Sequence, residues 1–183
     1  MKKESINLKN NLTIIALNTE FKKYIAKTLA NVLDMFYVDI NEFVKYDVVD
    51  VNQIIKTAGL EYYNMLETKA VKTISSYENT LTTLNLSTFF CNDNYKYLKQ
   101  SSVFIYVKVK FSDFKNKLLE ERPQSAMYEK LLNEKVFCER DDILVNLSDI
   151  VVNANLKEKN LTNKIIKSIK KYYKDILWKV MKW

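Results

Sequence analysis

The residue types that could do chemistry in this 183-residue chain are limited by what it lacks. There is no histidine, so the commonest general base and the commonest metal ligand are both missing. Cys91 and Cys138 lie far apart without a C-x-x-C spacing, which favours two reduced, partly buried thiols over a metal or redox site. Any chemistry would therefore come from carboxylates, lysines, hydroxyls and the only two arginines, Arg122 and Arg140.

The net charge of +7 comes from 29 Lys and Arg against 22 Asp and Glu. Nearly all of these cations are lysines, which are solvated point charges, whereas arginine makes the bidentate contacts typical of specific phosphate or base recognition. A lysine excess spread along the chain favours a solubilising surface over a nucleic-acid site. The single Gly and single Pro, beside many Lys, Asn, Ile and Tyr, are also typical of a genome-wide nucleotide bias.

The N-terminal residues 2–11 are mostly polar or charged. They contain no apolar stretch of the ~7–15 residues that a signal peptide needs, and nothing in the chain approaches the ~18 needed for a membrane span. We therefore expect a cytoplasmic protein. With 48% hydrophobic residues and no visible linker, we expect residues 1–183 to form one domain.

Short, apolar or β-branched runs predict five strands, at 12–16, 36–38, 80–86, 103–109 and 150–152. Helical patterns lie between them, at 41–46, 51–57, 60–75, 95–100, 111–120, 128–138 and 160–183, and one more follows a cap at Asn18 or Thr19. This alternation predicts an α/β fold, a three-layer sandwich with a short parallel five-stranded sheet. In such folds the ligand site lies at the carboxyl ends of the strands.

The order of these elements and several short motifs resemble the shikimate kinase family, P-loop enzymes similar to nucleoside-monophosphate kinases. Residues 22–30 resemble the end of the family pattern G-x-x-G-x-G-K-S-T-x-G-x-x-L-A. MFYVDIN at 35–41 resembles M-x-F-x-D-x-D, and AGLEYYNMLE at 58–67 resembles E-G-E-x-x-F-R-x-x-E.

The resemblance continues to about residue 172. SVFIYV at 102–107 is similar to the strand G-V-V-V-Y-L, and ERP at 121–123 stands where the lid carries R-P-L. Residues 139–152 resemble E-R-x-x-x-Y followed by A-D-x-x-V. Gly59, Pro123 and both arginines fall where the family pattern has those residue types, and the resemblance implies a P-loop kinase fold.

The phosphate-binding loop (Walker A) departs from that pattern. Its glycines let backbone N–H groups surround a phosphate, while Lys and Ser/Thr serve the phosphate and Mg²⁺. The three glycine positions carry side chains here: Ala16, Thr19 and Phe21. Lys22 matches the motif lysine and is the residual cofactor-binding candidate, but Lys23 and Tyr24 replace the Ser-Thr pair, and Glu20 would repel a polyphosphate. We predict a degenerate loop with no ATP cofactor and no metal.

On the acceptor side, the resemblance implies that carboxylates at a strand end serve Mg²⁺ and the substrate hydroxyls. Asp39 is retained, whereas Asn41 replaces the second carboxylate. Asn64 stands in place of a substrate-binding arginine, Arg140 matches the remaining one, and Arg122 matches the lid arginine. The resemblance therefore implies Asp39 and Arg122 as residual catalytic candidates, with Arg140, Asn41 and Asn64 as residual substrate-binding candidates.

Each of these residues also has a purely structural interpretation. Arg140 is expected to form an ion pair with a neighbouring acid, and the candidates are Glu139, Asp141 and Asp142. For Asp39 the structural alternative is a cap of the helix predicted at 41–46. Lys22 is one of many lysines and is expected to be solvated.

The last helix has apolar residues at steps of three and four: Ile165, Ile169, Tyr172, Ile176, Val180 and Trp183. We expect it to pack on the sheet with its lysines outward. The C-terminal helical extension 175–183 runs past the family resemblance and contains Trp178 and Trp183. Such an end could dock on a protein partner or on an anionic membrane surface.

The favoured hypothesis is a catalytically degenerate shikimate-kinase-like protein with a non-catalytic role, binding or regulating a partner or ligand. One alternative is a divergent active shikimate kinase of aromatic amino-acid biosynthesis, which would use ATP and Mg²⁺ with Asp39, Arg122 and Arg140 assisting. Another is a basic nucleic-acid-binding domain, which the scarcity of arginine and the lack of a recognition motif disfavour. Neither the partner nor the oligomeric state follows from the sequence.

Overall fold

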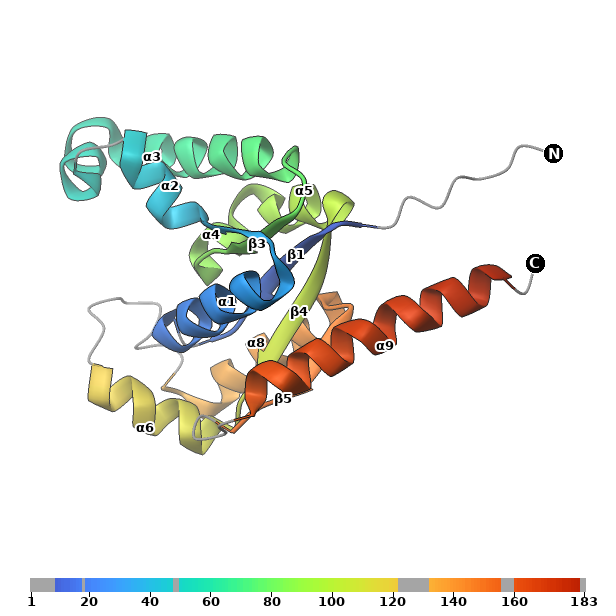
Figure 1. Cartoon of the computed structure of the whole chain (residues 1–183). Coiled ribbons are helices and arrows are strands. Elements are labelled where there is room, and N and C mark those ends of the chain that lie inside the picture. The colour runs from blue at the N-terminus through green and yellow to red at the C-terminus, as the bar shows by residue number, and fades with distance from the viewer. Residues whose placement is uncertain (1–8, 18, 48–49, 122–131, 156–159, 182–183) are drawn as a thin grey trace.

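The sheet is the feature that organises this molecule. The computed structural model describes residues 9–17, 19–47, 50–121, 132–155 and 160–181. Five strands pair in parallel in the order β2-β3-β1-β4-β5 (Figure 1). They are β1 (Asn11–Ile15), β2 (Phe36–Asp39), β3 (Thr80–Thr83), β4 (Ser102–Lys108) and β5 (Ile150–Asn153). The predicted α/β class and five-stranded parallel sheet are confirmed.

Helices cover both faces of the sheet, as a parallel sheet requires. They are α1 (Thr19–Leu33), α2 (Ile40–Asp47), α3 (Val51–Ser75), α4 (Leu86–Phe90), the 3₁₀ turn η1 (Cys91–Asp93), α5 (Asn94–Ser101), α6 (Phe111–Glu121), α8 (Glu134–Leu147) and α9 (Leu161–Met181). Helices α1 and α9 lie on one face, and α5 and α8 lie on the other (Figure 1).

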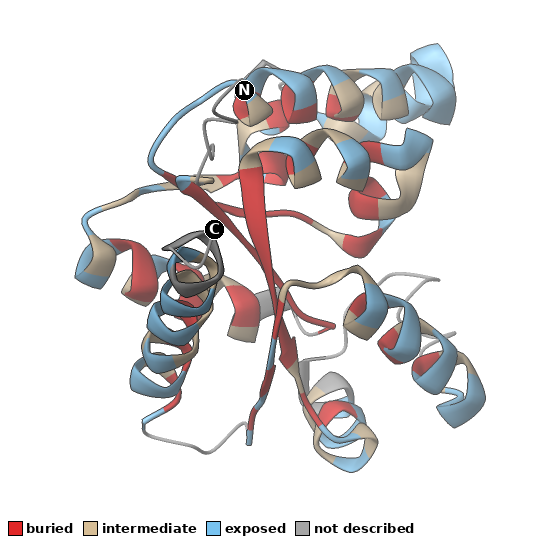
Figure 2. Ribbon diagram, turned by 90° about the vertical axis from the view of Figure 1, so that its right-hand side faces the viewer, coloured by how far each residue is buried: buried red, intermediate tan, exposed pale blue. Residues whose placement is uncertain are grey.

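The core forms around the two central strands. All of β1 is buried, and its register pairs Leu12 with Leu81 of β3 and with Val103 of β4. Helix α1 turns Ile25 and Leu29 onto this surface at a spacing of four residues. Each fully buried aliphatic side chain contributes about 1.5–3 kcal/mol of transfer free energy. Figure 2 shows the buried residues concentrated in the sheet and on the inner faces of the helices.

The strand predicted at 80–86 is shorter in the structure. β3 ends at Thr83, where the ladder with β2 ends at the pair Asp39–Thr83. Beyond it, the backbone N–H of Asn85 donates to the side-chain oxygen of Asn41 instead of to a neighbouring strand, and α4 begins at Leu86. The side chain of Asn41 therefore directs the chain out of the sheet.

Two helices also differ from the prediction. α8 begins at Glu134, because Asn133 caps it by accepting from the N–H groups of Lys135 and Val136, and it continues to Leu147 instead of ending at 138. The predicted start of this helix, residues 128–131, lies outside the described residues. The helices predicted at 51–57 and 60–75 are the two parts of α3, which is interrupted at Gly59 by a φ of 87° and a ψ of 163°.

Helix α9 packs on the sheet through its first half. Ile165 and Ile169 are buried, and the Tyr173 hydroxyl donates to the carbonyl of Lys9 at 2.6 Å. The helix then continues past the sheet (Figure 1). Within the described residues, none of the helices combines the length and the apolar character that a bilayer crossing requires.

Candidate functional site

The carboxyl ends of the strands bring three of the predicted site residues, Lys22, Asp39 and Asn41, to one edge of the sheet. β1 leads into the turn before α1, β2 ends at Asp39, and β3 is followed by Leu84 and Asn85. Ligands bind at this edge in open α/β folds, because the loops and helix N-termini converge there. The segment 16–24 and the predicted residues Asp39 and Asn41 all belong to this edge.

The connection between β1 and α1 is short. Ala16 and Leu17 are buried, and α1 already begins at Thr19. Phe21 therefore lies in the first turn of the helix, where its ring packs against the core. Among the described residues of segment 16–24, which exclude Asn18, none has a positive φ. A backbone nest for phosphate needs glycine-like geometry, and none of these described residues has it.

Lys22 is buried instead of solvated, so the expectation of a solvated side chain was wrong. Only 2% of its surface is exposed, and its ammonium group donates to the backbone carbonyl of Leu84, just beyond β3. A buried ammonium needs such an acceptor to compensate for the water that it has lost. The contact links the first turns of α1 to the end of β3.

Lys23 forms ion pairs with two carboxylates at this edge. Its ammonium lies 3.2 Å from Asp39 and 2.8 Å from Glu42. Partial burial lowers the pKa of Lys23, but the hydrogen bond to Glu42 and the charge of Asp39 outweigh it, so the pKa is raised overall. The lysine therefore stays protonated between two carboxylates.

Asp39 has the structural role of a helix cap. Its carboxylate accepts from the backbone N–H groups of Asn41 at 3.0 Å and Glu42 at 3.3 Å, in the first turn of α2. Tyr37 extends the group, since its hydroxyl lies 3.5 Å from Asp39 and 3.0 Å from Thr83. Burial raises the pKa of Tyr37 to about 12. The predicted cap is therefore present, and Lys23 neutralises the same carboxylate.

Asn41 belongs to a buried polar cluster that also contains Glu67 and Thr88. Its amide nitrogen donates to Glu67 at 3.1 Å and lies 3.0 Å from the Thr88 hydroxyl, which itself donates to Glu67 at 2.7 Å. The amide oxygen accepts from Asn85 N–H at 2.8 Å. Both ends of the Asn41 amide are therefore engaged, and the cluster joins α2, α3 and α4.

Glu67 is the buried carboxyl of this cluster, with 4% of its surface exposed. Burial raises its pKa, although hydrogen bonds from Thr88, Tyr63 and Asn41 act in the opposite direction. Burial also raises the pKa of Tyr63 to about 12, with a further contribution from the charge of Glu67. Glu67 therefore holds a proton more tightly than an exposed glutamate does.

Arg140 contacts an aromatic ring instead of the predicted acid. Its guanidinium lies 4.9 Å from the ring centre of Phe90, and among the described residues it forms no ion pair. Asp141, one of its expected partners, instead accepts from the Tyr106 hydroxyl at 2.6 Å and pairs with Lys108. The expected ion pair of Arg140 was therefore wrong, because α8 turns Asp141 toward β4.

Two predicted residues remain. Asn64 is half-buried on α3, one turn before Glu67, and Arg122 lies outside the described residues. Within the described ranges, no three Cys, Asp or Glu side chains are grouped as a metal site would need.

Sequence reasoning did not select Glu67, Thr88 or Lys23 as site residues. A signal existed for Glu67, because it follows Tyr63 by four residues and precedes Val71 by four, on the buried face of α3. Lys23 was marked only as a departure from the Ser-Thr pair of the motif, and Thr88 gave no signal, since its partners come from other elements.

Comparison with protein families adds an independent result. The family model described as shikimate kinase matches residues 21–170. The match begins at Phe21, so β1 and most of the segment that aligns with the phosphate-binding loop lie outside it. A search of curated protein sequences finds no match.

Solved structures match over nearly the whole chain. Shikimate kinase from Acinetobacter baumannii in complex with shikimate has a TM-score of 0.71 and 16% identity, covering 90% of this chain and 94% of its own. Shikimate kinase from Aquifex aeolicus has a TM-score of 0.68 and 19% identity, covering 87% and 96%. Shikimate kinase from Bacteroides thetaiotaomicron has a TM-score of 0.70 and 12% identity, covering 90% and 98%. At these identities the structures establish a shared fold.

Proposed function

The chain belongs to the shikimate kinase family, and we propose that it is a catalytically degenerate member with a non-catalytic binding role. One observation carries the proposal. Lys22, which aligns with the lysine of the phosphate-binding loop, is buried and donates to the carbonyl of Leu84. A lysine that serves a nucleotide directs its ammonium toward phosphate oxygens. Here the acceptor is the protein's own backbone.

The contacts of Lys23 support the same proposal on the metal side. The Walker A motif uses a Ser or Thr hydroxyl at this position to ligate Mg²⁺. A protonated lysine has no lone pair to offer a metal, and Lys23 already neutralises Asp39 and Glu42. A magnesium ion beside Asp39 would have to displace this ammonium, so the residues present do not fit Mg²⁺–ATP.

The residues at the position of the phosphate acceptor support the loss of phosphoryl transfer for a different reason. The resemblance implies that the carboxylates of the strand end serve Mg²⁺ and the substrate hydroxyls, and Asn41 stands in place of the second one. A neutral amide cannot take a proton from a hydroxyl nucleophile. Its nitrogen and oxygen also already have partners in Glu67, Thr88 and Asn85.

The competing proposal, a divergent active kinase, rests on Asp39. This carboxylate is retained at the end of β2, where the family pattern has one. It could still orient a substrate if Lys23 released it. The same experiment separates the two proposals, because an active kinase must bind ATP.

Calorimetric titration of the full chain with Mg²⁺–ATP, and separately with shikimate, provides that test. At a protein concentration of about 100 µM, a dissociation constant of 1 mM or tighter gives measurable heat. We expect no ATP binding in this range. The shikimate kinase from Aquifex aeolicus, titrated under the same conditions, serves as the positive control.

A coupled assay for ADP release with ATP and shikimate completes the test. Turnover above that of a Lys22→Ala variant would establish the active kinase and overturn the degenerate assignment. Micromolar ATP binding without turnover would also contradict the proposal, since the closed turn would then have to open around a phosphate.

A further inference from the structure

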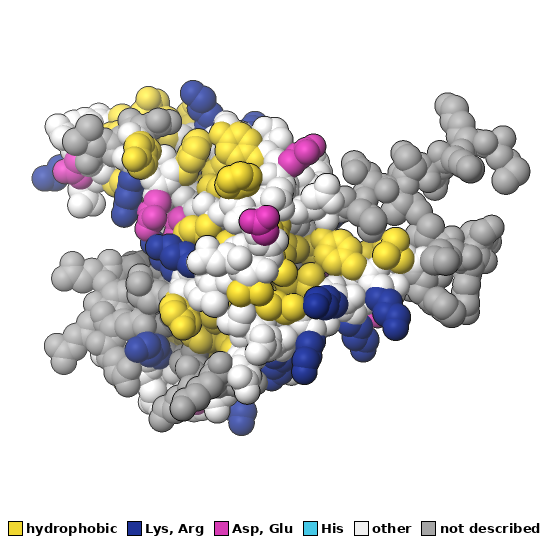
Figure 3. Space-filling view, in the orientation of Figure 1, with side chains coloured by type: hydrophobic (Ala, Val, Ile, Leu, Met, Phe, Trp, Pro, Cys, Tyr) yellow, Lys and Arg dark blue, Asp and Glu magenta, His cyan; other side chains and the backbone are white. Residues whose placement is uncertain are grey.

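The first part of α3 packs one set of apolar side chains against the core and leaves a second set exposed. We call residues 51–66 the α3 arm. None of them is buried, and burial in α3 begins only at Glu67. Leu60 is 57% exposed and Met65 is 65% exposed, and Ile55 and Tyr62 are also exposed. Figure 2 shows this end of α3 as largely exposed, and Figure 3 shows hydrophobic side chains over the same region.

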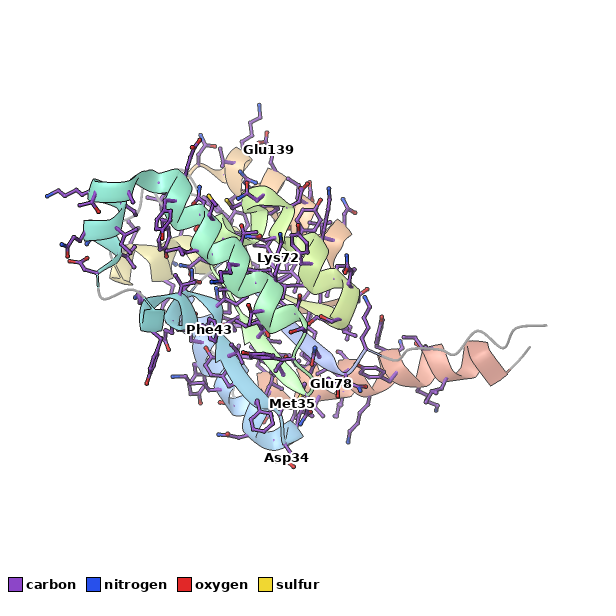
Figure 4. All side chains as sticks on the ribbon, turned by 90° about the horizontal axis from the view of Figure 1, so that it is seen from above. Asp34, Met35, Phe43, Lys72, Glu78 and Glu139 are labelled. Atoms are coloured by element: carbon purple, nitrogen blue, oxygen red, sulfur yellow. The ribbon has the colours of Figure 1, made fainter. Side chains whose placement is uncertain are left out.

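The arm projects from the body of the molecule. Seen from above, α3 crosses the molecule near Lys72, and its other end reaches the margin (Figure 4). The arm bends at Gly59, which divides it into a first half, 51–58, and a second half, 60–66. A side chain added at Gly59 would meet no atom within 4 Å, so the bend is open to solvent. Another backbone can therefore approach closely at this point.

Charge on the arm is confined to two opposite groups. Lys56 lies in the first half and Glu61 in the second, and they are the only charged residues of the arm. Within the part of the chain that the structure describes, neither forms an ion pair. The arm is thus neutral, while the whole chain carries +7.

We propose that the α3 arm is a dimerisation surface and that its occupant is the arm of a second copy of this chain. A two-fold axis through the bend, between Ala58 and Gly59, sets the first half of one arm against the second half of the other, with opposite chain directions. Each residue then lies opposite one at the same distance from the axis in the second copy.

This register is self-complementary in charge. It brings Lys56 opposite Glu61 of the second copy, and the symmetry repeats that pair, so both charges of each arm find an opposite charge. It also sets Ile55 opposite Tyr62 of the second copy. Glycine at the axis permits the two backbones to come close, as small residues do where helices cross.

The composition favours a second copy over an acidic partner. The lysine excess of the rest of the chain would attract an acidic protein to many surfaces. The arm itself has no net charge, so it would not strengthen that attraction. An arm with one positive and one negative group at equal distances from its centre can pair both charges with a second copy that runs in the opposite direction. Isologous contacts in two-fold dimers have this property.

Sedimentation velocity of the full chain, from about 1 µM to about 300 µM, tests the proposal. We expect a reversible monomer–dimer equilibrium. Lys56→Glu sets like charges against each other twice, and Glu61→Lys does the same with the opposite sign. Each variant should dissociate on the order of tenfold more readily. Lys69→Glu, on an exposed position of α3 outside the arm, makes the same charge change and should leave the equilibrium unaltered.

The decisive measurement is the mixture of the two single variants. Lys56→Glu and Glu61→Lys should dimerise with each other about as well as the unaltered chain does with itself, because both cross pairs are then opposite in charge. Circular dichroism of each variant checks that folding is unaffected.

Three results would overturn the proposal. They are a monomer over the whole concentration range, a dimer that Lys56→Glu leaves as strong as Lys69→Glu does, and a mixture no tighter than its separate components. The inference does not depend on the loss of ATP binding, since calorimetry tests that property and sedimentation tests this one.

Discussion

The two sides of the candidate site differ in how their side chains are held. Between β1 and α1, Phe21 packs on the core and Lys23 pairs with Asp39 and Glu42. On the acceptor side, a polar cluster of Asn41, Glu67 and Thr88 remains, but its members bond to each other. One side is therefore held by packing and an ion pair, and the other by hydrogen bonds among its own polar groups.

The two sides of the site should therefore respond differently to substitution. The stability of an apolar turn depends on packing, so the free energy of unfolding falls with each buried methylene group that is removed. A satisfied polar cluster depends on complete partnering, so the loss of one member leaves the others unpaired in the interior. Four substitutions probe this difference, beginning with the largest expected effect.

Phe21→Gly restores the residue type that the family pattern has at this position. We expect the free energy of unfolding to fall by about 3 kcal/mol, because the ring leaves a void beside the core and glycine weakens the first turn of α1. Chemical denaturation measures the change. Phe21→Leu, which keeps most of the volume, should lose less than about 1.5 kcal/mol. Equal stability of Phe21→Gly and the unaltered chain would mean that the turn is an open loop.

Asn41→Ala tests the acceptor side. The substitution removes the donor to Glu67 and the acceptor for Asn85 N–H, both in the interior. We expect a loss of about 2 kcal/mol, the scale of leaving buried polar groups unpaired. Asn163→Ala, on the exposed face of α9, is the control and should change stability by no more than about 0.5 kcal/mol. A loss no greater than this control would show that water replaces Asn41 in the cluster.

Lys23→Met removes the ammonium between Asp39 and Glu42 while keeping the length of the side chain. Asp39 retains its two backbone donors in α2, so the loss should be only about 1 kcal/mol. Lys45→Met on the exposed face of α2 provides the matched control. Thermal unfolding at low and high salt separates the charge contribution, which should shrink as salt is added. A loss that salt leaves constant would point to packing by the lysine stem.

Glu67→Gln has the smallest effect, below about 1 kcal/mol, and it depends on pH. Burial raises the pKa of Glu67, so its folded form binds a proton more tightly than its unfolded form. The stability that this proton gives is fully present below the ordinary pKa of about 4.5 and is lost as the pH rises through the raised value. Glutamine does not ionise, so the variant should gain stability relative to the unaltered chain between pH 4 and pH 7. A parallel pH dependence of the two proteins would contradict the raised pKa.

Much of the fold was predictable because apolar runs at β1 and β4 are buried strands and the intervening patterns are helical. The end of β3 was not, because it depends on the side chain of Asn41, far away in the sequence. In the site, the cap at Asp39 follows from its place between strand and helix. The acceptor of Lys22 lies 62 residues along the chain, and Arg140 stacks on Phe90 from a different element, so neither contact leaves a local pattern.

The cation that Lys23 supplies differs from any metal in one respect: it is covalently attached. A bound ion exchanges with solvent, and the helices around it can separate each time it leaves. An ammonium on its own side chain has a fixed stoichiometry of one and cannot be removed by a chelator. The joint between α1 and the β2–α2 corner is thus made by the chain's own side chains and does not depend on the supply of magnesium.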